Sequence, residues 1–462
     1  MIKIRLKNLG PIKQAEFELG ESLTIICGEN NTGKTYTTHA LFGFLYELRK
    51  LLTVSIEDAI VETLLNNGVV EVSLEDYLDK YELILQQGCE KYTQLLPNIL
   101  SAPKEHFKTT EFQIILDKKP SLKHEFKGGI RTENAEIFSL SKSEDSMKLA
   151  VSLLTGIEKN VFPSHVIKTI ISDAIIEIIF SKLFYNPFIS STERTGAAIF
   201  SNELNFSRNN LLKEMHNLDK NADPRELLFK SYQNYALPVE QNVDFIRNLN
   251  KITKKTSFII EKHPEILDDF ADIIGGNYSI TNNDELHFKP KGSKIKLTMD
   301  ESSSAVRSLL DIGFYLRHIA KEGDLLMVDE PELNLHPENQ RRIARLFARL
   351  IKIGIKVFIT THSDYIVKEL NTLIMLNHDQ PYLKIIAEEE GYHEYELISA
   401  NQIKVYIAEK KSIKLDGKTR KSKCQTLTSA RIDPELGIEA RSFDTTINTM
   451  NRIQEAVVWG GD

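Results

Sequence analysis

Hydrophobic and polar residues alternate with two different periods along this chain, and the changes of period mark the elements that the sequence predicts. Residues 2–7 and 15–19 alternate one by one around a Gly-Pro pair, so they predict two strands joined as a hairpin. The short apolar run at 22–27 predicts a buried strand, and residues 34–52 repeat with the helical period. A glycine-rich loop is therefore expected between a buried strand and a helix.

The middle of the chain predicts two helical insertions on either side of a short strand. Residues 47–184 have a mostly helical pattern with charged stretches, and residues 200–270 are again helical and polar. Between them, residues 185–199 predict a strand that leads into a loop. Residues 272–300 alternate and contain Gly and Asn turns, which indicates a small antiparallel sheet.

The C-terminal half predicts helices between buried strands. A helix is expected to begin near Ser303 and Ser304. The stretch "GDLLMVDEPE" predicts a buried strand that ends in acids, "PENQRRIARLFARLIKIG" predicts a helix, and "KVFITTHSDY" predicts a second buried strand. This succession of strand, helix and strand implies a mostly parallel sheet, and the fold class is therefore α/β.

Composition and charge limit the classes of function. The 462 residues are 41% hydrophobic and 27% charged, as in an ordinary soluble protein of two or three domain-sized units, or of one domain with large insertions. A net charge of −7 argues against a surface that grips nucleic acid all over. The basic stretch 409–423 is either a charged surface hairpin that turns at Asp416-Gly417 or a contact for a partner or nucleic acid.

The cysteine content and the apolar segments indicate the cellular compartment. Three cysteines without zinc spacing suggest a reducing cytoplasm, with Cys27 as a small buried hydrophobe. The N-terminus alternates like a strand and lacks the apolar segment of a signal peptide. Residues 166–184 carry charges at helical spacing and predict an amphipathic helix rather than a membrane span. We therefore expect a cytoplasmic protein without membrane contact.

The glycine-rich loop carries the first candidate chemistry. Gly28, Gly33, Lys34 and Thr35 fit the pattern G-x-x-x-x-G-K-[ST], in which the glycines let backbone N–H groups wrap around phosphate oxygens. Lys34 can reach the β- and γ-phosphates, and the Thr35 hydroxyl can ligate Mg²⁺. The alternative is a chance loop, which the strand before it and the helix after it disfavour. The residues predicted to hold ATP here are Gly28, Asn30, Asn31, Thr32, Gly33, Lys34, Thr35 and Tyr36.

Two later strands end in residues that suit the same chemistry. A buried strand delivers Asp329, which can hold Mg²⁺, and Glu330, which can deprotonate an attacking water. The next strand ends at His362, which can sense the γ-phosphate by a hydrogen bond. The predicted catalytic residues are therefore Glu330, His362 and Lys34. The alternative for the acids is an ordinary strand end with a capping carboxylate.

The order and spacing of these motifs resemble the ATP-binding-cassette (ABC) ATPase superfamily, in its soluble branch of chromosome-maintenance and Rad50-like heads. The resemblance covers residues 1–46 and 270–380. It implies a signature loop that acts on the ATP of a second subunit, and the best match is "SSSAVRSL". Ser303 matches the signature serine, whereas Ser304 and Ala305 stand where the family has glycines. The alternative is a simple serine N-cap.

Shorter segments narrow the resemblance. "DEPELNLHPENQ", "FISSTERTG" and "SFDTTINTMN" resemble the AAA15 group, which shares its head with the OLD nucleases and occurs in anti-phage systems of the PARIS and Septu types. The resemblance implies a homodimer, or a higher oligomer of such dimers, that closes around ATP. It also implies an effector in trans, a nuclease or toxin, and a viral trigger protein. No Asp-x-Asp pair follows His362, so no nuclease is expected within this chain.

The sequence leaves open the position of the family's Q-loop, the role of Arg194 and two alternative functions. The glutamine of the family's Q-loop has no clear match, and the strand end at 190–194 is where it would lie. Arg194 there either faces the nucleotide, or holds the insertion against the head, or is a packing arginine in a salt bridge. The alternative functions are a DNA repair or recombination ATPase of the RecF or Rad50 kind, and an interaction protein with an inactive nucleotide site.

The resemblance therefore predicts an ABC ATPase head with a mixed sheet, an N-terminal antiparallel β lobe and large helical insertions. The predicted division is a head N-terminal lobe at 1–46, a helical insertion at 47–184, a head strand and loop at 185–199, a helical arm at 200–270, a head C-terminal lobe at 271–400 and a C-terminal β/α segment at 401–462.

Overall fold

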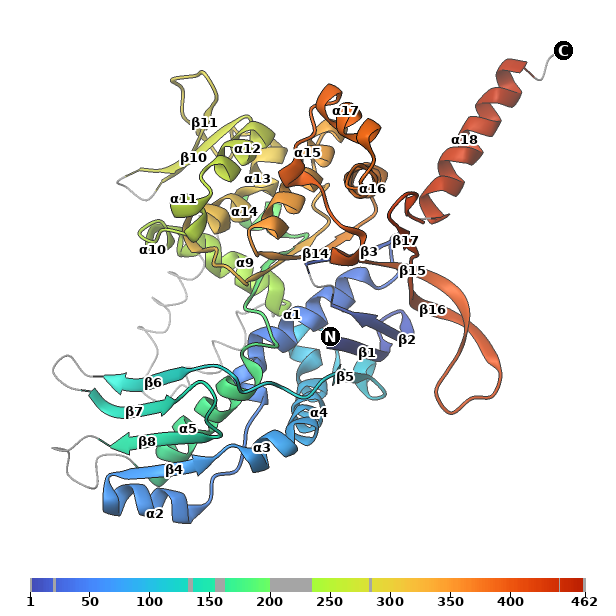
Figure 1. Cartoon of the computed structure of the whole chain (residues 1–462). Coiled ribbons are helices and arrows are strands. Elements are labelled where there is room, and N and C mark those ends of the chain that lie inside the picture. Colours follow the sequence, from blue (N-terminus) through green and yellow to red (C-terminus); the bar gives the residue numbers. More distant parts are fainter. Residues whose placement is uncertain are drawn as a thin grey trace, which may run out of the picture.

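The structure is a computed structural model of the chain (Figure 1). It describes residues 2–19, 22–131, 136–153, 163–199, 235–281, 285–439 and 441–459. Across these ranges it shows a mixed α/β architecture, which confirms the predicted fold class. Within the same ranges, no helix combines the length and apolar character needed to cross a membrane.

A six-stranded mixed sheet forms the centre of the molecule. In spatial order its strands are β16 (Lys421–Ser429), β15 (Ile403–Lys414), β3 (Leu23–Gly28), β14 (Lys356–Thr361), β13 (Leu325–Asp329) and β9 (Pro187–Ser190). All neighbours pair in parallel except β15 and β16, which form an antiparallel hairpin. The residues of β3 and β13 are buried throughout, because layers cover both faces of the sheet.

The sheet separates two apolar cores, and successive residues of its strands alternate between them. Met327 packs into the first core, whereas its neighbours Leu326 and Val328 pack into the second. The first core joins the sheet to the N-terminal lobe and to helices α1 (Lys34–Leu51), α4 (Tyr81–Ile99) and α5 (Ser164–Phe180). The second core lies under α12 (Glu265–Ile274), α15 (Pro337–Lys352) and α16 (Asp364–Leu376), on the opposite side of the sheet (Figure 1).

The N-terminal lobe is a three-stranded antiparallel sheet, as predicted. The first hairpin consists of β1 (Ile2–Leu9) and β2 (Ile12–Glu18). The third strand, β5 (Glu111–Leu116), comes from the inserted segment and pairs with the other edge of β1. The insertion is therefore tied to the lobe by backbone hydrogen bonds.

The helical interpretation of residues 47–184 is wrong for part of this segment. A four-stranded antiparallel sheet stands among its helices, with strands in the order β4 (Val69–Ser73), β8 (Lys148–Leu153), β7 (Glu136–Lys142) and β6 (Phe126–Arg131). Alternate residues such as Leu149 and Val151 are buried, while the residues between them face outward. These strands are short and half polar, so their alternation is hard to separate from the helical pattern around them.

The remaining described elements of residues 47–184 are α2 (Asp58–Asn67), α3 (Glu75–Asp79) and η1 (Lys104–Phe107).

The segment after β9 is helical sooner than predicted. The expected loop is short, and α6 (Arg194–Ile199) begins at Arg194. Of the predicted second helical arm, residues 200–234 lie outside the described part of the chain. The rest is helical, in α9 (Leu237–Arg247), α10 (Leu249–Ile252), α11 (Phe258–Lys262) and α12.

The predicted small antiparallel sheet is present as β10 (Gly276–Ile280), β11 (Leu286–Pro290) and β12 (Leu297–Thr298). The helix expected after it consists of α13 (Ser304–Ser308), α14 (Leu310–Phe314) and the π-helical turn η2 (Tyr315–Ile319). The remaining elements are α17 (Pro381–Glu389), η3 (Glu394–Glu396), η4 (Ala400–Gln402), β17 (Ile432–Asp433), β18 (Gly437–Ile438) and α18 (Arg441–Trp459). Helix α18 extends away from the six-stranded sheet and the helices that cover it (Figure 1).

Candidate functional site

The glycine-rich loop connects β3 to α1, in the position that the sequence predicts. Gly28 has φ +144° and Gly33, the N-cap of α1, has φ +97°, so both have backbone conformations that favour glycine. A Cβ atom on Gly28 would lie 2.6 Å from the carbonyl oxygen of Ala408. The loop is therefore shaped both by its own glycines and by the neighbouring strand β15.

Lys34 is buried beneath this loop. Its Nζ donates hydrogen bonds to the carbonyl oxygens of Gly28, at 2.9 Å, and Glu29, at 2.8 Å. The Thr32 hydroxyl donates to the same Glu29 carbonyl at 2.7 Å, which closes the loop on itself. The ammonium is thus held where the backbone of the loop curves, and it can exchange these carbonyls for phosphate oxygens.

The other predicted nucleotide contacts differ in their surroundings. Asn30 and Asn31 are exposed at the outer edge of the loop, where Asn31 has φ +61°. Thr35 is half-buried in the first turn of α1, next to Lys34. Tyr36 contacts the N-terminal lobe, because a Cβ on Gly10 would lie 2.8 Å from its ring. The first turn of α1 therefore offers free N–H groups to an anion while its flank packs on the lobe.

Asp329 has the surroundings expected of a cation ligand. Its side chain is fully buried at the end of β13, and Oδ1 accepts a hydrogen bond from the Thr360 hydroxyl of β14. The second oxygen, Oδ2, is buried and has no hydrogen-bond partner among the described residues. A buried carboxylate oxygen without a partner is costly, and a divalent cation would satisfy it. The residues therefore fit Mg²⁺ held by Asp329 and Thr35.

Glu330 and His362 lie together at the ends of adjacent strands. His362 Nδ1 is 3.3 Å from Glu330 Oε1 and 3.2 Å from Glu332 Oε1. The backbone of Glu330 has φ +50°, an uncommon conformation for a residue with a side chain. The backbone N–H of Glu330 donates to the Thr360 carbonyl at 3.1 Å, and this contact fixes the turn. The structure thus places both predicted catalytic side chains on one edge of the sheet.

Glu332 supports His362 and was not predicted from the sequence. Its buried Oε1 accepts from the His362 backbone N–H at 2.7 Å and from the Thr361 hydroxyl at 2.8 Å. Burial raises the pKa of the Glu332 carboxyl, and the hydrogen bonds it accepts oppose that rise. The position of this glutamate, two residues after Glu330, is the only signal in the sequence.

Arg194 forms no salt bridge within the described residues, and its side chain does not face solvent. It is buried, and its guanidinium donates to four backbone carbonyls, those of Ser308 at 2.7 Å, Ser191 at 2.8 Å, Asp329 at 2.6 Å and Glu330 at 2.8 Å. The burial lowers the pKa of the guanidinium. Arg194 is thus a packing residue that holds the turn carrying the acids through backbone carbonyls rather than through a salt bridge, and its contact with a nucleotide stays a prediction.

His39 also faces this region from α1. It is buried five residues after Lys34, and its Nε2 has no hydrogen-bond partner within the described ranges. Burial lowers the pKa of this imidazole, and the negative charges of Asp329 and Glu193 partly oppose the shift. Helical spacing puts His39 on the buried face of α1, but only the fold brings it near Asp329.

The predicted signature residues lie apart from the phosphate loop of the same chain. The Ser303 side chain caps α13 by accepting a hydrogen bond from the Val306 N–H, and both Ser303 and Ser304 are exposed. The Ser303 N-cap alternative is therefore present, and the exposure also leaves the serines accessible to another molecule. The helix is joined to the acidic turn by the Ser308 hydroxyl, which donates to the Leu333 carbonyl at 3.1 Å.

Comparisons with known proteins agree with this chemistry. The sequence profile of the family described as "AAA ATPase domain" (AAA15) matches residues 1–367. No curated protein sequence matches the chain.

Among solved structures, the chain is similar to heads of SMC proteins. A crystal structure of an Smc head bound to the C-terminal winged-helix domain of ScpA has 12% identity and a TM-score of 0.34, and the match covers 92% of this chain and 97% of that one. An Smc head with an extended coiled coil, bound to the C-terminal domain of ScpA from Pyrococcus furiosus, has 14% identity, a TM-score of 0.32 and coverages of 98% and 100%. The SMC head domain from Thermotoga maritima has 10% identity, a TM-score of 0.31 and coverages of 93% and 98%.

Proposed function

The chain belongs to the AAA ATPase domain family (AAA15), and from that premise we propose that it binds ATP with Mg²⁺ and hydrolyses the γ-phosphate. One observation carries the proposal. Three neighbouring parallel strands, β3, β14 and β13, end at the loop of Lys34, at His362 and at the Asp329-Glu330 pair. Ligands of such sheets bind outside the carboxyl ends of the strands, so these groups meet one substrate.

The binding step uses groups already in place. The phosphates enter the curve of the loop, and Lys34 Nζ turns from the carbonyls of Gly28 and Glu29 to the β- and γ-phosphate oxygens. Thr35 and the unpaired Oδ2 of Asp329 would hold Mg²⁺. When bound, the ion neutralises phosphate charge as the bond to the leaving oxygen breaks.

The hydrolytic step rests on Glu330. Its carboxylate takes a proton from water as the water oxygen attacks the γ-phosphorus and ADP leaves through the bridging oxygen. His362, 3.3 Å from Glu330 Oε1, orients this carboxylate and donates a hydrogen bond to the γ-phosphate. Glu332 and Arg194 hold the two backbone segments from which these side chains project.

The active form in this proposal is a dimer that closes around two ATP molecules. The exposed Ser303 at the start of α13 contacts the γ-phosphate of the partner subunit and completes its site. Support comes from the resemblance to ABC heads and from the separation of Ser303 from the loop of its own chain. Closure would move α13 and, through the Ser308–Leu333 contact, the turn after Glu330.

The output of this cycle is control of a second protein, an effector such as a nuclease or toxin, in defence against phage. Support comes from the segments that resemble the AAA15 group of defence operons. The inserted segment that joins the N-terminal lobe through β5 provides a surface that would move with the head. Co-expression with the products of neighbouring genes, followed by purification with and without ATP, tests for such a partner.

Glu330→Gln tests the proposed reaction. Because the amide cannot accept the proton, phosphate release should fall by about 100-fold or more, whereas ATP binding should be retained. ATP should then accumulate in a dimer that light scattering detects. Glu338→Gln on α15, an exposed glutamate of the same region, is the matched control. Unchanged phosphate release by Glu330→Gln would refute the assignment.

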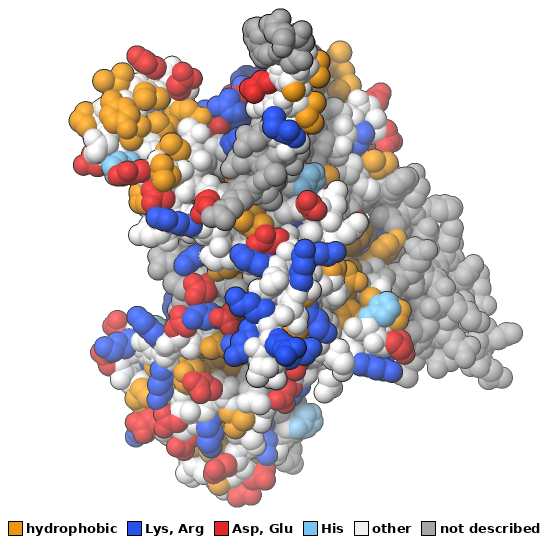
Figure 2. Space-filling view, turned by 90° about the vertical axis from the view of Figure 1, so that its right-hand side faces the viewer, with side chains coloured by type: hydrophobic (Ala, Val, Ile, Leu, Met, Phe, Trp, Pro, Cys, Tyr) orange, Lys and Arg blue, Asp and Glu red, His pale blue; other side chains and the backbone are white. Residues whose placement is uncertain are grey.

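A second function, DNA binding in repair or recombination, is favoured by the hairpin of β15 and β16. Figure 2 shows a group of basic side chains over this hairpin. Its exposed residues that form no ion pair within the described ranges are Lys410, Lys414, Lys418, Arg420, Lys421 and Lys423. Duplex binding that weakens with salt, and that replacement of these residues by glutamine abolishes, supports this function. Absence of binding at low salt excludes it.

A further inference from the structure

A cavity lies away from the nucleotide site, near the helix that begins at Ser303. It has a volume of about 350 Å³, within the range of small-molecule sites. Residues from α10, α12, β10, α14 and η2 line it. Its apolar wall consists of Leu267, Phe270, Ile274, Tyr278, Ile280 and Phe314.

The rings in this wall are held in fixed positions. The ring centroid of Tyr278 is 5.8 Å from that of Phe314 and 6.4 Å from that of Phe270. Gly313 lets them approach, since a Cβ there would lie 2.7 Å from Phe270 and 2.8 Å from Tyr278. The cavity is therefore preformed, and its wall suits a flat aromatic or branched apolar group.

The polar lining is positive. Lys254 and Arg317 line the cavity, are exposed, and form no ion pair within the part of the chain that the structure describes. His318 also lines it, with Nδ1 2.9 Å from the Lys255 carbonyl. Among the residues that the structure describes, no Asp or Glu belongs to the lining. Two unpaired cations beside an apolar wall suit a ligand that carries an anionic group on an apolar body.

The cavity is connected to the predicted signature helix by one hydrogen bond. The Tyr278 hydroxyl donates to the backbone carbonyl of Val306, in α13. The same chain segment continues through α14 into η2, whose Arg317 and His318 form the cavity's edge. A π-helical turn such as η2 is uncommon and is frequent at functional sites. A ligand in this cavity would thus contact η2 directly and α13 only through Tyr278.

We propose that this cavity binds an organic anion with an aromatic body, and that its occupancy changes the position of α13 and hence the rate of the ATPase cycle. The binding part is independent of the nucleotide site, whereas the regulatory part rests on the proposed function. Two sources offer this chemistry, a free aromatic acid and the C-terminal residue of a partner peptide.

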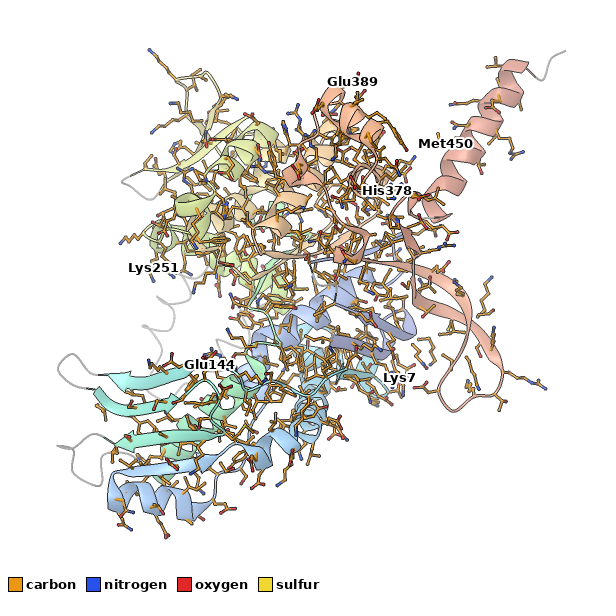
Figure 3. All side chains as sticks on the ribbon, viewed as in Figure 1. Lys7, Glu144, Lys251, His378, Glu389 and Met450 are labelled. Atoms are coloured by element: carbon orange, nitrogen blue, oxygen red, sulfur yellow. The ribbon has the colours of Figure 1, made fainter. Side chains whose placement is uncertain are left out.

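The binding part is tested without ATP, with 8-anilinonaphthalene-1-sulfonate as the fluorescent probe. The neutral analogue N-phenyl-1-naphthylamine lacks the sulfonate and reports the apolar wall alone. The charge variant is Lys254→Gln/Arg317→Gln. The matched control is Lys251→Gln on α10, because Lys251 is exposed three residues before Lys254 and lies outside the lining (Figure 3).

The charge variant should bind the sulfonate at least about tenfold more weakly, because two charge-assisted contacts are lost. Its affinity for the neutral analogue should stay unchanged, and the control should match the wild type with both probes. Equal sulfonate binding by the charge variant and the wild type would overturn the proposal. Matching thermal unfolding of all three proteins excludes probe binding to unfolded chains.

Displacement of the probe separates the two sources. Displacement by 3-phenylpropionate indicates a free aromatic acid. Displacement only by a pentapeptide that ends in phenylalanine with a free carboxylate, and not by the amidated peptide, indicates a partner terminus. Either result supports the anion site, and displacement by none of them contradicts it.

Tyr278→Phe tests the connection to α13, because it keeps the ring and removes the hydroxyl. The probe should still bind with an affinity close to that of the wild type. In the wild type the probe should change the rate of phosphate release by about threefold or more, and in Tyr278→Phe this effect should disappear. A probe effect of equal size in both proteins would refute the connection. A wild type without ATPase activity would instead refute the proposed function and leave the binding result standing.

Discussion

Arg194 donates a hydrogen bond from Nη2 to the backbone carbonyl of Glu330 at 2.8 Å, from a buried guanidinium that forms no salt bridge within the described ranges. The same group holds the carbonyls of Asp329 and Ser308. One side chain thus joins the end of β9 to the acidic turn and to the helix that begins at Ser303. The orientation of Glu330, whose backbone has φ +50°, depends on these contacts.

Arg194→Lys should therefore damage the protein although it keeps the charge. An ammonium cannot reach four carbonyls as the planar guanidinium does, so we expect a loss of about 3 kcal/mol in the free energy of unfolding. Phosphate release per folded molecule should fall by about tenfold or more, because Glu330 is no longer held. Urea unfolding and phosphate release measure the two effects. Arg452→Lys, at an exposed arginine of α18, should change neither, and an equally stable and active Arg194→Lys would contradict this role.

Ser303→Asp separates capping from action in a partner's site. Aspartate caps a helix as well as serine does, so the stability should stay within about 0.5 kcal/mol of the wild type. Its negative charge would repel the γ-phosphate of the partner subunit, so ATP-dependent dimers and turnover should be lost. Ser303→Ala should show the opposite pattern, with a loss of about 1 kcal/mol in stability and a smaller loss of activity. Full activity of Ser303→Asp would mean that Ser303 is an N-cap only.

The acceptor role of Glu332 predicts different results for two substitutions. Glu332→Gln keeps an oxygen that can accept from the His362 N–H and the Thr361 hydroxyl, so its stability should stay close to that of the wild type. Glu332→Ala leaves both donors without that acceptor and should cost about 2 kcal/mol. Turnover should fall more in the alanine variant, because His362 loses its support. Chemical unfolding measures the stabilities, with Glu338→Ala as the exposed control. Equal damage by both substitutions would show that the negative charge of Glu332, not its acceptor, is what matters.

Burial of His39 predicts a dependence of stability on pH. Because the folded state lowers the pKa of this imidazole below its unfolded value, acid protonates the unfolded chain first. Stability is therefore lost as the pH falls below about 6.5, by up to about 1.4 kcal/mol per pH unit, until the lower folded pKa is reached.

The comparison of wild type with His39→Gln isolates this contribution. Chemical unfolding at pH 7.5 and 5.5 should show a smaller loss of stability in the variant, because other titrating groups act equally in both proteins. His106→Gln, at an exposed position, should lose as much as the wild type. An identical loss in His39→Gln and the wild type would show that His39 does not titrate differently on unfolding.

The parts of this protein that depend on local pattern could be predicted from the sequence alone. The buried strands, the helix after Gly33 and the acids at 329 and 330 follow from runs, periods and motif spacing, because each is specified by residues close together in the chain. The parallel sheet then brings Lys34, Asp329 and His362 together, since the carboxyl ends of parallel strands share one edge.

The contacts between distant segments became known only from the folded chain. Residues 47–184 contain a sheet that the helical pattern concealed, because short half-polar strands become recognisable only when they pair. The sequence allowed several roles for Arg194, and only the fold shows that its guanidinium donates to backbone carbonyls more than a hundred residues away. The chemical groups at the strand ends can therefore be read from the sequence. How each group is held depends on the packing of remote segments, because burial and hydrogen-bond partners are properties of the folded chain.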